Sequence, residues 1–346
     1  IIDSNFKKIL DIFFKAKCLE DFKEKFYFIQ KKKYPDNLYR DMINFLEEKN
    51  KKETCARFDI HNLVNSDIKL KETYAYNGCN FQINFDCEQN KRLIHASLNH
   101  LVTKTNHTVR DVIDITSDKK SYFLYHHKKL VLQCNLDQFY LLQGKLMLLI
   151  FNTIYQKREH DWIANFHAST ISSGKEAIMC IGNSGKGKST LTALLMAHGF
   201  ELVADDISPL LQENIRVYKN PSAISIKEGA FDLLNEKFSD FKNIKSHFVN
   251  ESKGMVKYLP PIAGDFNFNY SCKKVVLVNY NKHTTHKLRE IPIEDALRIL
   301  IPESWISPKK RNAKAFLKWI KSCEFYELSY SNTDEALNSF KILFSR

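Results

Sequence analysis

The pattern of hydrophobic and polar positions changes character along the first hundred residues. Apolar side chains recur at helical spacing between Asn5 and Lys17 and again after Asp36, which can cap a second helix. The run Phe81–Phe85 instead places a hydrophobic residue at every second position. That period is typical of a half-buried strand, so helices followed by a sheet are expected in this part of the chain.

A hairpin and a long helix are expected next. The apolar runs Tyr122–Tyr125 and Leu130–Gln133 flank His126-His127-Lys128, which predicts a β-hairpin. Two adjacent histidines at a loop tip are potential metal ligands, but the sequence suggests no third ligand, and we expect them to be solvated. Leu136–Lys157 predicts a long helix, interrupted mildly by Gly144.

The second half mixes strands and helices. Its clearest strand is Lys274–Asn279, whereas Asn243–Gly254 is polar and predicts a loop. The other expected elements are strands at Ser208–Gln212, Ile215–Tyr218, His286–Glu290 and Phe325–Ser329, and helices at Phe231–Phe238, Ile293–Ile301, Lys309–Cys323 and Thr333–Phe344. The order predicts an α/β domain over residues 156–346, preceded by a smaller α+β domain over residues 1–155.

One stretch of the second half carries a specific motif. Gly182 to Ser189 reads GNSGKGKS and satisfies the phosphate-binding loop pattern G-x-x-x-x-G-K-[ST]. The apolar run Ala177–Ile181 predicts a strand before the loop, and Ser189–Ala197 predicts a helix after it, which is the context that the motif needs. Backbone N–H groups and the helix N-terminus would bind phosphate oxygens, Lys188 would reach the terminal phosphates, and the Ser189 hydroxyl would bind Mg²⁺. The residues expected to contact the nucleotide are Gly182, Asn183, Ser184, Gly185, Lys186, Gly187, Lys188, Ser189 and Thr190.

Two aspartates follow the loop and its helix. Asp205 and Asp206 end the apolar run Leu202–Ala204. A short helix, a turn and a strand would return them to the phosphates, where one could bind Mg²⁺ through water and the other could accept a proton from an attacking hydroxyl. The alternative is that both only cap the next segment.

A histidine precedes the loop. Ser172-Ser173-Gly174-Lys175 predicts a turn, so Trp162–Ile171 can pair with Glu176–Ile181 as a hairpin. A turn centred between Ser173 and Gly174 places His167 opposite Cys180, beside the start of the loop. There His167 could bind phosphate or assist proton transfer, although a lone histidine is more often structural.

Composition narrows the function classes. The net charge of +12 suits an acidic partner, but the lysines are spread over the whole chain, and a nucleic-acid partner is not expected. Eight cysteines without C-x-x-C pairs argue against a zinc or disulfide framework and for the cytoplasm. Apolar runs are far shorter than the roughly 20 residues of a membrane span, and no signal peptide is evident.

The stretch from His167 to Asp206 resembles the catalytic domain of the bacterial HPr kinase/phosphorylase family and its kinase relatives. In that family a histidine precedes a loop reading G-x-S-G-x-G-K-S, and a glycine and a hydrophobic-Ala-Asp-Asp stretch follow the helix. Here His167, Gly182–Ser189, Gly199 and Val203–Asp206 take those places without a gap. A looser likeness extends through the C-terminal strands and helices.

The resemblance implies an HPr kinase-like fold for the C-terminal domain and a site that holds ATP and Mg²⁺. It implies Asp206 as general base, Asp205 in a metal or supporting role and a part in catalysis for His167. It also makes a homo-oligomer plausible. The expected metal ligands are Ser189, Asp205 and Glu228, the last from a weak match, Ile226-Lys227-Glu228-Gly229, to the Glu-x-Arg-Gly-type signature of the family.

Because that signature is incomplete, the chain looks more like divergent relatives that phosphorylate serine or peptides. The expected activity is transfer of the γ-phosphoryl group of ATP to a serine-type hydroxyl of a peptide or protein, with the N-terminal domain recruiting the substrate or mediating assembly. Two alternatives stay open: a kinase of free serine or a sugar, and a nucleotide-dependent switch or ATPase. Asn281-Lys282-His283-Thr284 lacks the aspartate of the N-K-x-D motif of GTPases, and we regard it as a chance fragment.

Overall fold

The structure is a computed structural model, and contacts divide it into two compact units, residues 1–62 and 63–346. The residues that it describes are 12, 19–30, 68–104, 108–249, 253–264 and 267–345. In the first unit, helix α2 (Leu19–Gln30) buries Phe22 and Phe26, whose ring centroids lie 6.0 Å apart. The helices expected at residues 5–17 and after Asp36 lie outside the described residues, apart from Ile12.

The second unit begins with a five-stranded sheet in the order β1-β2-β3-β4-β5. Its strands are β1 (Leu70–Tyr76), β2 (Cys79–Phe85), β3 (Asp111–Ser117), β4 (Ser121–His126) and β5 (Lys129–Asn135). Strands β2 and β3 are parallel and are connected through helix α4 (Glu88–Leu98), and the other neighbours are antiparallel. The strand expected at Phe81–Phe85 and the hairpin around His127 are therefore confirmed.

Helix α5 (Phe139–Tyr155) follows a short 3₁₀ turn, η3 (Leu136–Gln138), which confirms the helix expected over this segment. The helix packs on the five-stranded sheet, and its core also includes Trp162, Leu211 and Tyr218 from beyond residue 155. Contacts join residues 63–346 into one compact unit. The division into domains at residues 1–155 and 156–346 stays a prediction.

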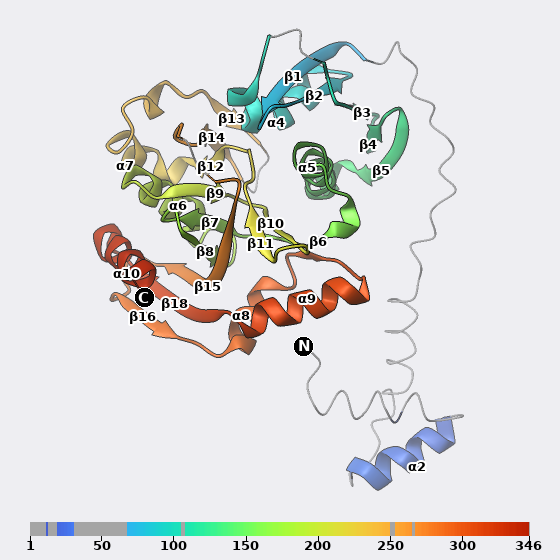
Figure 1. The fold of residues 1–346 in the computed structure, drawn as a ribbon, viewed down its shortest axis with the longest axis vertical. Coiled ribbons are helices and arrows are strands. Elements are labelled where there is room, and N and C mark those ends of the chain that lie inside the picture. Colours follow the sequence, from blue (N-terminus) through green and yellow to red (C-terminus); the bar gives the residue numbers. More distant parts are fainter. Residues whose placement is uncertain are drawn as a thin grey trace. The chain divides into compact units, whose positions relative to one another are not determined.

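A ten-stranded sheet forms the centre of the remaining fold (Figure 1). Strands β8, β15 and β18 run parallel at its middle, β7 and β9 continue one edge, and β11, β10, β6 and β17 extend from β15. The bounds are β6 (Trp162–Phe166), β7 (Ser169–Ser172), β8 (Glu176–Ile181), β9 (Glu201–Ala204), β10 (Ser208–Leu211), β11 (Arg216–Tyr218), β15 (Asn269–Tyr280), β16 (Lys287–Glu290), β17 (Trp305–Ile306) and β18 (Glu324–Tyr330).

Helices cover both faces of the parallel strands. Along β8, Met179 and Ile181 point to the core under α8 (Ile293–Leu300) and α9 (Lys310–Lys321), whereas Ile178 and Cys180 point to the core under α6 (Lys188–Ala197) and α10 (Thr333–Ser345). Successive strand side chains face opposite sides, so a strand covered on both faces is hydrophobic throughout. The chain therefore has a mixed α/β fold with several sheets.

A third sheet, in the order β12-β14-β13, packs against α6. Its strands are β12 (Ile224–Lys227), β13 (Ser246–Phe248) and β14 (Met255–Leu259), and helix α7 (Phe231–Asn235) lies between the first two in the sequence. The loop expected over Asn243–Gly254 is thus wrong at β13, whose backbone pairs with β14 although its side chains are only partly buried or exposed. A strand without a buried face has no hydrophobic alternation to reveal it.

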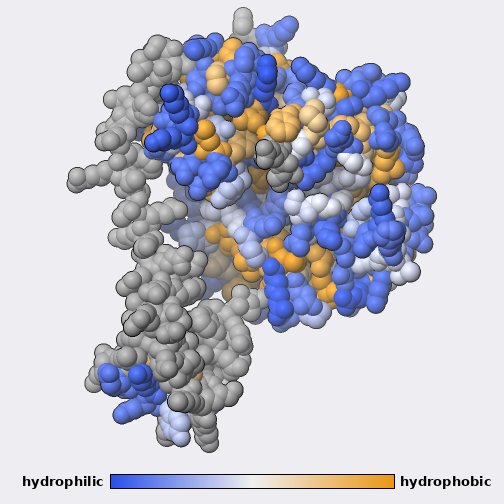
Figure 2. Space-filling model, turned by 180° about the vertical axis from the view of Figure 1, so that it is seen from behind, coloured by the Kyte–Doolittle hydropathy of each residue, from blue (hydrophilic) through white to orange (hydrophobic). Residues whose placement is uncertain are grey.

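The face of the molecule seen in Figure 2 carries mainly hydrophilic side chains, with hydrophobic ones in separate patches. Among the described residues, no helix is long and apolar enough to cross a membrane.

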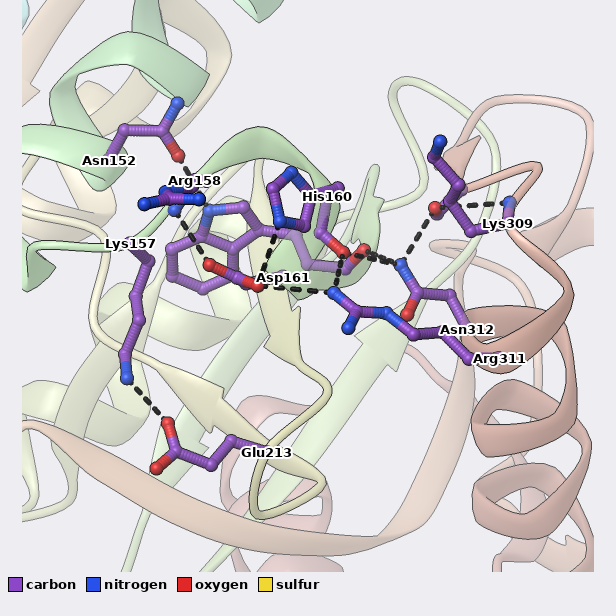
Figure 3. Close-up of polar contacts among 11 residues, drawn as sticks. Asn152, Lys157, Arg158, His160, Asp161, Glu213, Lys309, Arg311 and Asn312 are labelled. Atoms are coloured by element: carbon purple, nitrogen blue, oxygen red, sulfur yellow. Dashed lines mark hydrogen bonds and ion pairs between the residues drawn. The ribbon is translucent and has the colours of Figure 1, made fainter.

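A polar network connects the start of α9 to the segment before β6 (Figure 3). The Asn312 side chain is fully buried, and its amide nitrogen lies 2.9 Å from His160 O, 2.8 Å from Trp162 O and 2.8 Å from Ser307 Oγ. The neighbouring Arg311 is half exposed and donates to His160 O and to Asp161 Oδ1. Both side chains reach the same turn, but only one is buried.

This difference predicts unequal effects of two substitutions. Asn312→Ala should lower the free energy of unfolding by about 1–3 kcal/mol, because it removes the donor from the buried Trp162 carbonyl and from Ser307 Oγ. Arg311→Ala should lower it by less than about 1 kcal/mol, because water replaces the exposed guanidinium. Urea denaturation of both variants measures the difference, and equal losses would contradict the assigned role of Asn312.

Candidate functional site

The phosphate-loop motif lies between a buried strand and a helix, as its sequence predicts. Strand β8 leads into residues 182–187, and α6 begins at Lys188. Gly187 precedes the helix with φ 88°, and a Cβ there would lie 2.9 Å from Tyr280 Cβ. At Gly182, with φ 147°, a Cβ would lie 2.8 Å from the carbonyl oxygen of Val278. Glycine is therefore required at both positions, by backbone conformation and by space.

Lys188 is buried within this loop. Its ammonium donates to the carbonyl oxygens of Gly182 at 2.5 Å and Asn183 at 3.4 Å. Burial lowers the pKa of Lys188, and the nearby carboxylates of Asp206, Glu303 and Asp205 oppose that shift. The cation is thus held at the loop and faces anionic groups from two other segments.

The two predicted aspartates reach the loop because of the sheet order. Strands β8 and β9 are both antiparallel to β7, so their C-terminal ends meet at one edge. Asp205 follows β9 and is 3% exposed. Its Oδ1 accepts from Ser169 Oγ at 2.5 Å and from Ser189 Oγ at 2.9 Å, and its Oδ2 accepts from Ser225 N at 3.1 Å.

The buried position of Asp205 changes the pKa of its carboxyl group. Burial, followed by the charge of Asp206, raises its pKa to about 6, against the hydrogen bonds from three serines. A cation bound beside this buried carboxyl would stabilise its charged form. Asp205 and Ser189 together offer the oxygen donors that Mg²⁺ prefers.

Asp206 is less buried than Asp205, with its side chain 29% exposed. Ile207 N donates to Asp205 O at 2.7 Å, which closes a three-residue γ-turn around Asp206, and φ of Asp206 is 60°. Such a turn is rare and strained for a residue with a side chain, and strain of this kind concentrates at functional sites. The Asp206 carboxylate lies 3.8 Å from the Lys253 ammonium.

A cavity of about 300 Å³ opens above the loop. Its charged lining consists of Lys188, Lys227, Lys253 and Asp206, together with His167. The remaining lining residues are Ser184, Gly185, Gly187, Ser189, Thr190, Leu194, Ser225, Gly229, Ala230, Leu233, Tyr280, Tyr330 and Thr333. Three lysines against one aspartate give a positive pocket that suits a polyanionic ligand.

The hairpin predicted before the loop has a different register. Ser169, not His167, lies opposite Cys180, and Trp162–Phe166 forms the separate strand β6, which pairs with β10 and β17. The turn is centred one residue later than expected, because Gly174 adopts φ 91° and its N–H donates to Ser172 Oγ at 2.8 Å. Moving the centre by one residue moves every pairing by two.

His167 nevertheless lines the cavity. It lies between β6 and β7, its backbone N–H donates to Ser304 Oγ at 3.3 Å, and its Nε2 is 3.8 Å from Glu303 Oε2. His167 lies at the cavity because the connection between β6 and β7 brings it there, and not because it pairs with Cys180 in a hairpin.

The predicted site residues divide into two groups. Those that line the cavity are His167, Ser184, Gly185, Gly187, Lys188, Ser189, Thr190 and Asp206, whereas Gly182, Asn183, Lys186, Asp205 and Glu228 are not among its lining residues. Glu228 is exposed on the 3₁₀ turn η5 (Glu228–Ala230), although its neighbours Lys227 and Gly229 line the cavity.

Sequence reasoning missed the lysines and tyrosines of the cavity walls. Lys227 ends β12 and Lys253 precedes β14, both strands of the small sheet. Tyr280 and Tyr330 end the neighbouring strands β15 and β18. The tyrosines could have been predicted from the sequence, since residues that end parallel strands lie together at the loop edge of the sheet. The lysines could not, because long-range packing brings them to the loop.

Comparisons with known proteins give little further information. No family model and no curated protein matches this chain. Among solved structures, an Hpr(Ser) kinase/phosphatase from Coxiella burnetii matches 52% of this chain and 97% of its own, at 12% sequence identity and a TM-score of 0.24. So distant a likeness carries no argument about what this chain does.

Two loop glycines provide a matched test of the site geometry. Gly185 and Gly187 have φ of 80° and 88°, but a Cβ meets nothing within 4 Å at Gly185, whereas at Gly187 it meets Tyr280 Cβ at 2.9 Å and Tyr330 Oη at 3.1 Å. Gly185→Ala should cost about 1–2 kcal/mol of unfolding free energy for the left-handed backbone alone. Gly187→Ala should cost more, measured by urea denaturation. If Gly185→Ala is the more destabilising variant, the packing around Gly187 is misassigned.

Proposed function

We propose that this chain is an ATP-dependent kinase that transfers the γ-phosphoryl group to a serine-type hydroxyl of a peptide or protein. The observation that carries the proposal is the strained turn at Asp206, which directs a carboxylate into a lysine-rich cavity beside the phosphate-loop motif. A loop and a helix N-terminus account for phosphate binding. They do not require a carboxylate at the cavity wall, whereas a hydroxyl acceptor requires a base there.

The donor set fits Mg²⁺ bound to the nucleotide. Ser189 and Asp205 would hold the ion, since their oxygens lie 2.9 Å apart and burial, followed by the charge of Asp206, raises the pKa of the Asp205 carboxyl. When bound, Mg²⁺ would neutralise charge on the phosphate oxygens. Glu228 as a third ligand stays a prediction, with its exposed position on η5 offering no support.

In the proposed reaction Asp206 accepts the proton of the acceptor hydroxyl as its oxygen attacks the terminal phosphorus. The new oxygen–phosphorus bond forms while the bond to the β-phosphate oxygen breaks, so ADP leaves and the proton passes from Asp206 to solvent. Lys188 holds the terminal phosphates, and His167 binds phosphate or assists the proton transfer. Lys227 and Lys253 add positive charge to the cavity that receives the triphosphate.

Lys188→Ala should abolish ATP binding while the protein stays folded, because it removes the buried ammonium from the loop. Isothermal titration with ATP and Mg²⁺ measures the loss, and Lys175→Ala is the control, since Lys175 is exposed in the turn between β7 and β8 and does not line the cavity. If the control loses as much affinity as Lys188→Ala, the assignment of Lys188 to the phosphates is wrong.

Asp206→Asn should keep ATP binding but slow phosphoryl transfer by about two orders of magnitude or more, the usual contribution of a general base. Asparagine tolerates the left-handed backbone at this position, so the turn should survive. Asp240→Asn, at an exposed aspartate, controls for the change of charge. Transfer close to the wild-type rate in Asp206→Asn would remove the proposed base.

The acceptor hydroxyl can be identified directly. Mass spectrometry after incubation with ATP, Mg²⁺ and a panel of free serine, sugars and serine-bearing peptides would identify it. Phosphorylated peptide supports the proposal, and phosphorylated free serine or sugar supports the small-molecule alternative. ATP hydrolysis that no acceptor alters would instead support a nucleotide-dependent switch. Cytoplasmic location, homo-oligomerisation and substrate recruitment by residues 1–155 also stay predictions.

A further inference from the structure

The turn between β4 and β5 brings two histidines onto one carboxylate. His126 Nε2 lies 2.7 Å from Asp111 Oδ1, and His127 Nε2 lies 3.0 Å from the same oxygen. In the part of the chain that the structure describes, these three side chains form the group of potential metal ligands whose donor atoms all lie within 4.8 Å of one another. The third ligand that the sequence did not suggest is therefore Asp111, supplied by strand β3.

An unusual backbone produces this convergence. His127 and Lys128 have φ of 48° and 63°, a pair of left-handed residues that hairpin turns usually reserve for asparagine and glycine. Successive side chains of a strand would point to opposite faces. Here the ring centroids of His126 and His127 lie only 4.4 Å apart. The turn thus holds both imidazoles on the side where Asp111 lies.

A residue of α5 orients the carboxylate. The Asp111 side chain is 10% exposed, and its second oxygen, Oδ2, accepts a hydrogen bond from the Thr153 hydroxyl. That bond leaves Oδ1 directed at the imidazoles, in the way that outer hydrogen bonds orient metal-ligating carboxylates. The His127 side chain is 60% exposed, so an ion can enter from solvent.

We propose that Asp111, His126 and His127 bind a divalent transition metal ion, with Zn²⁺ as the best fit. Two imidazole nitrogens and one carboxylate oxygen suit Zn²⁺, whereas Mg²⁺ and Ca²⁺ prefer oxygen ligands throughout. Each neutral imidazole would bind through the Nε2 lone pair with its proton on Nδ1, and an imidazolium would first release a proton to water.

The two histidine–carboxylate distances require only a small rearrangement. Ligand atoms at about 2.0–2.1 Å from a tetrahedral zinc ion lie about 3.3 Å from one another. The present separations of 2.7 Å and 3.0 Å must therefore open by a few tenths of an ångström. The exposed His127 ring can supply much of that movement. Three protein ligands leave a fourth position for water, and none of the three lines the cavity at the phosphate-loop motif.

The test uses tag-free full-length protein, dialysed against EDTA and titrated with Zn²⁺ by calorimetry and with Co²⁺ by visible absorption. We expect one equivalent of metal at this site, and Co²⁺ bands without the thiolate charge-transfer absorption that bound cysteines would produce. His126→Gln and His127→Gln should each weaken binding at least about tenfold. Circular dichroism should show both variants folded, because His126 ends β4 with a side chain that is 29% exposed and His127 lies in the turn with a side chain that is 60% exposed.

His160→Gln is the matched control. His160 Nε2 lies 3.6 Å from Asp161 Oδ1, so it forms a single histidine–aspartate pair with a partly exposed carboxylate. This variant should bind metal like the wild type. The proposal is overturned if wild-type protein fails to bind Zn²⁺ or Co²⁺, or if His127→Gln binds with unchanged affinity and stoichiometry.

Discussion

The geometry of the candidate site depends on one buried carboxylate. Asp205 is held by Ser169 of β7, Ser189 of α6 and the backbone of Ser225 in β12, so three separate elements meet on its two oxygens. Burying such a group is costly unless hydrogen bonds or a cation compensate it. Asp205 faces inwards to collect these bonds, and the γ-turn at the next residue brings the Asp206 carboxylate to the cavity wall. The site thus combines one carboxylate held inside the fold with one presented to the cavity.

Local patterns predicted most of the elements of the α/β fold, but not how they pair. Alternation revealed β2, and the continuous apolar run Lys274–Asn279 revealed β15, although the strand extends back to Asn269. The predicted hairpin register is wrong because Gly174 and the Ser172 hydroxyl shift the turn by one residue. The sequence around Ser-Gly is compatible with several turn geometries and does not select this one. Strand β13 shows no hydrophobic alternation, so only its backbone pairing with β14 identifies it as a strand.

In the candidate site, too, local motifs could be predicted from the sequence and long-range contacts could not. The loop from Gly182 to Ser189 and the two aspartates are local motifs, and the sheet order brings them together as expected. The walls of the cavity come from residues whose spacing in the sequence is uninformative, such as Lys253, about fifty residues after the aspartates. Asp111 is a second example, because its partnership with the β4–β5 turn exists only once β3 and β4 have paired. Long-range pairing is the part that sequence reasoning lacks.

The core that joins α5 to β6 has an optical consequence. The chain contains three tryptophans. Trp162 packs among Phe151, Tyr155 and Tyr218 in that core, Trp305 packs against the same core, and Trp319 stacks on Phe166 in the core under α9. None of the three indoles lines the cavity at the phosphate-loop motif. Intrinsic fluorescence will therefore report the integrity of two separate cores and stay nearly silent when a ligand enters the cavity.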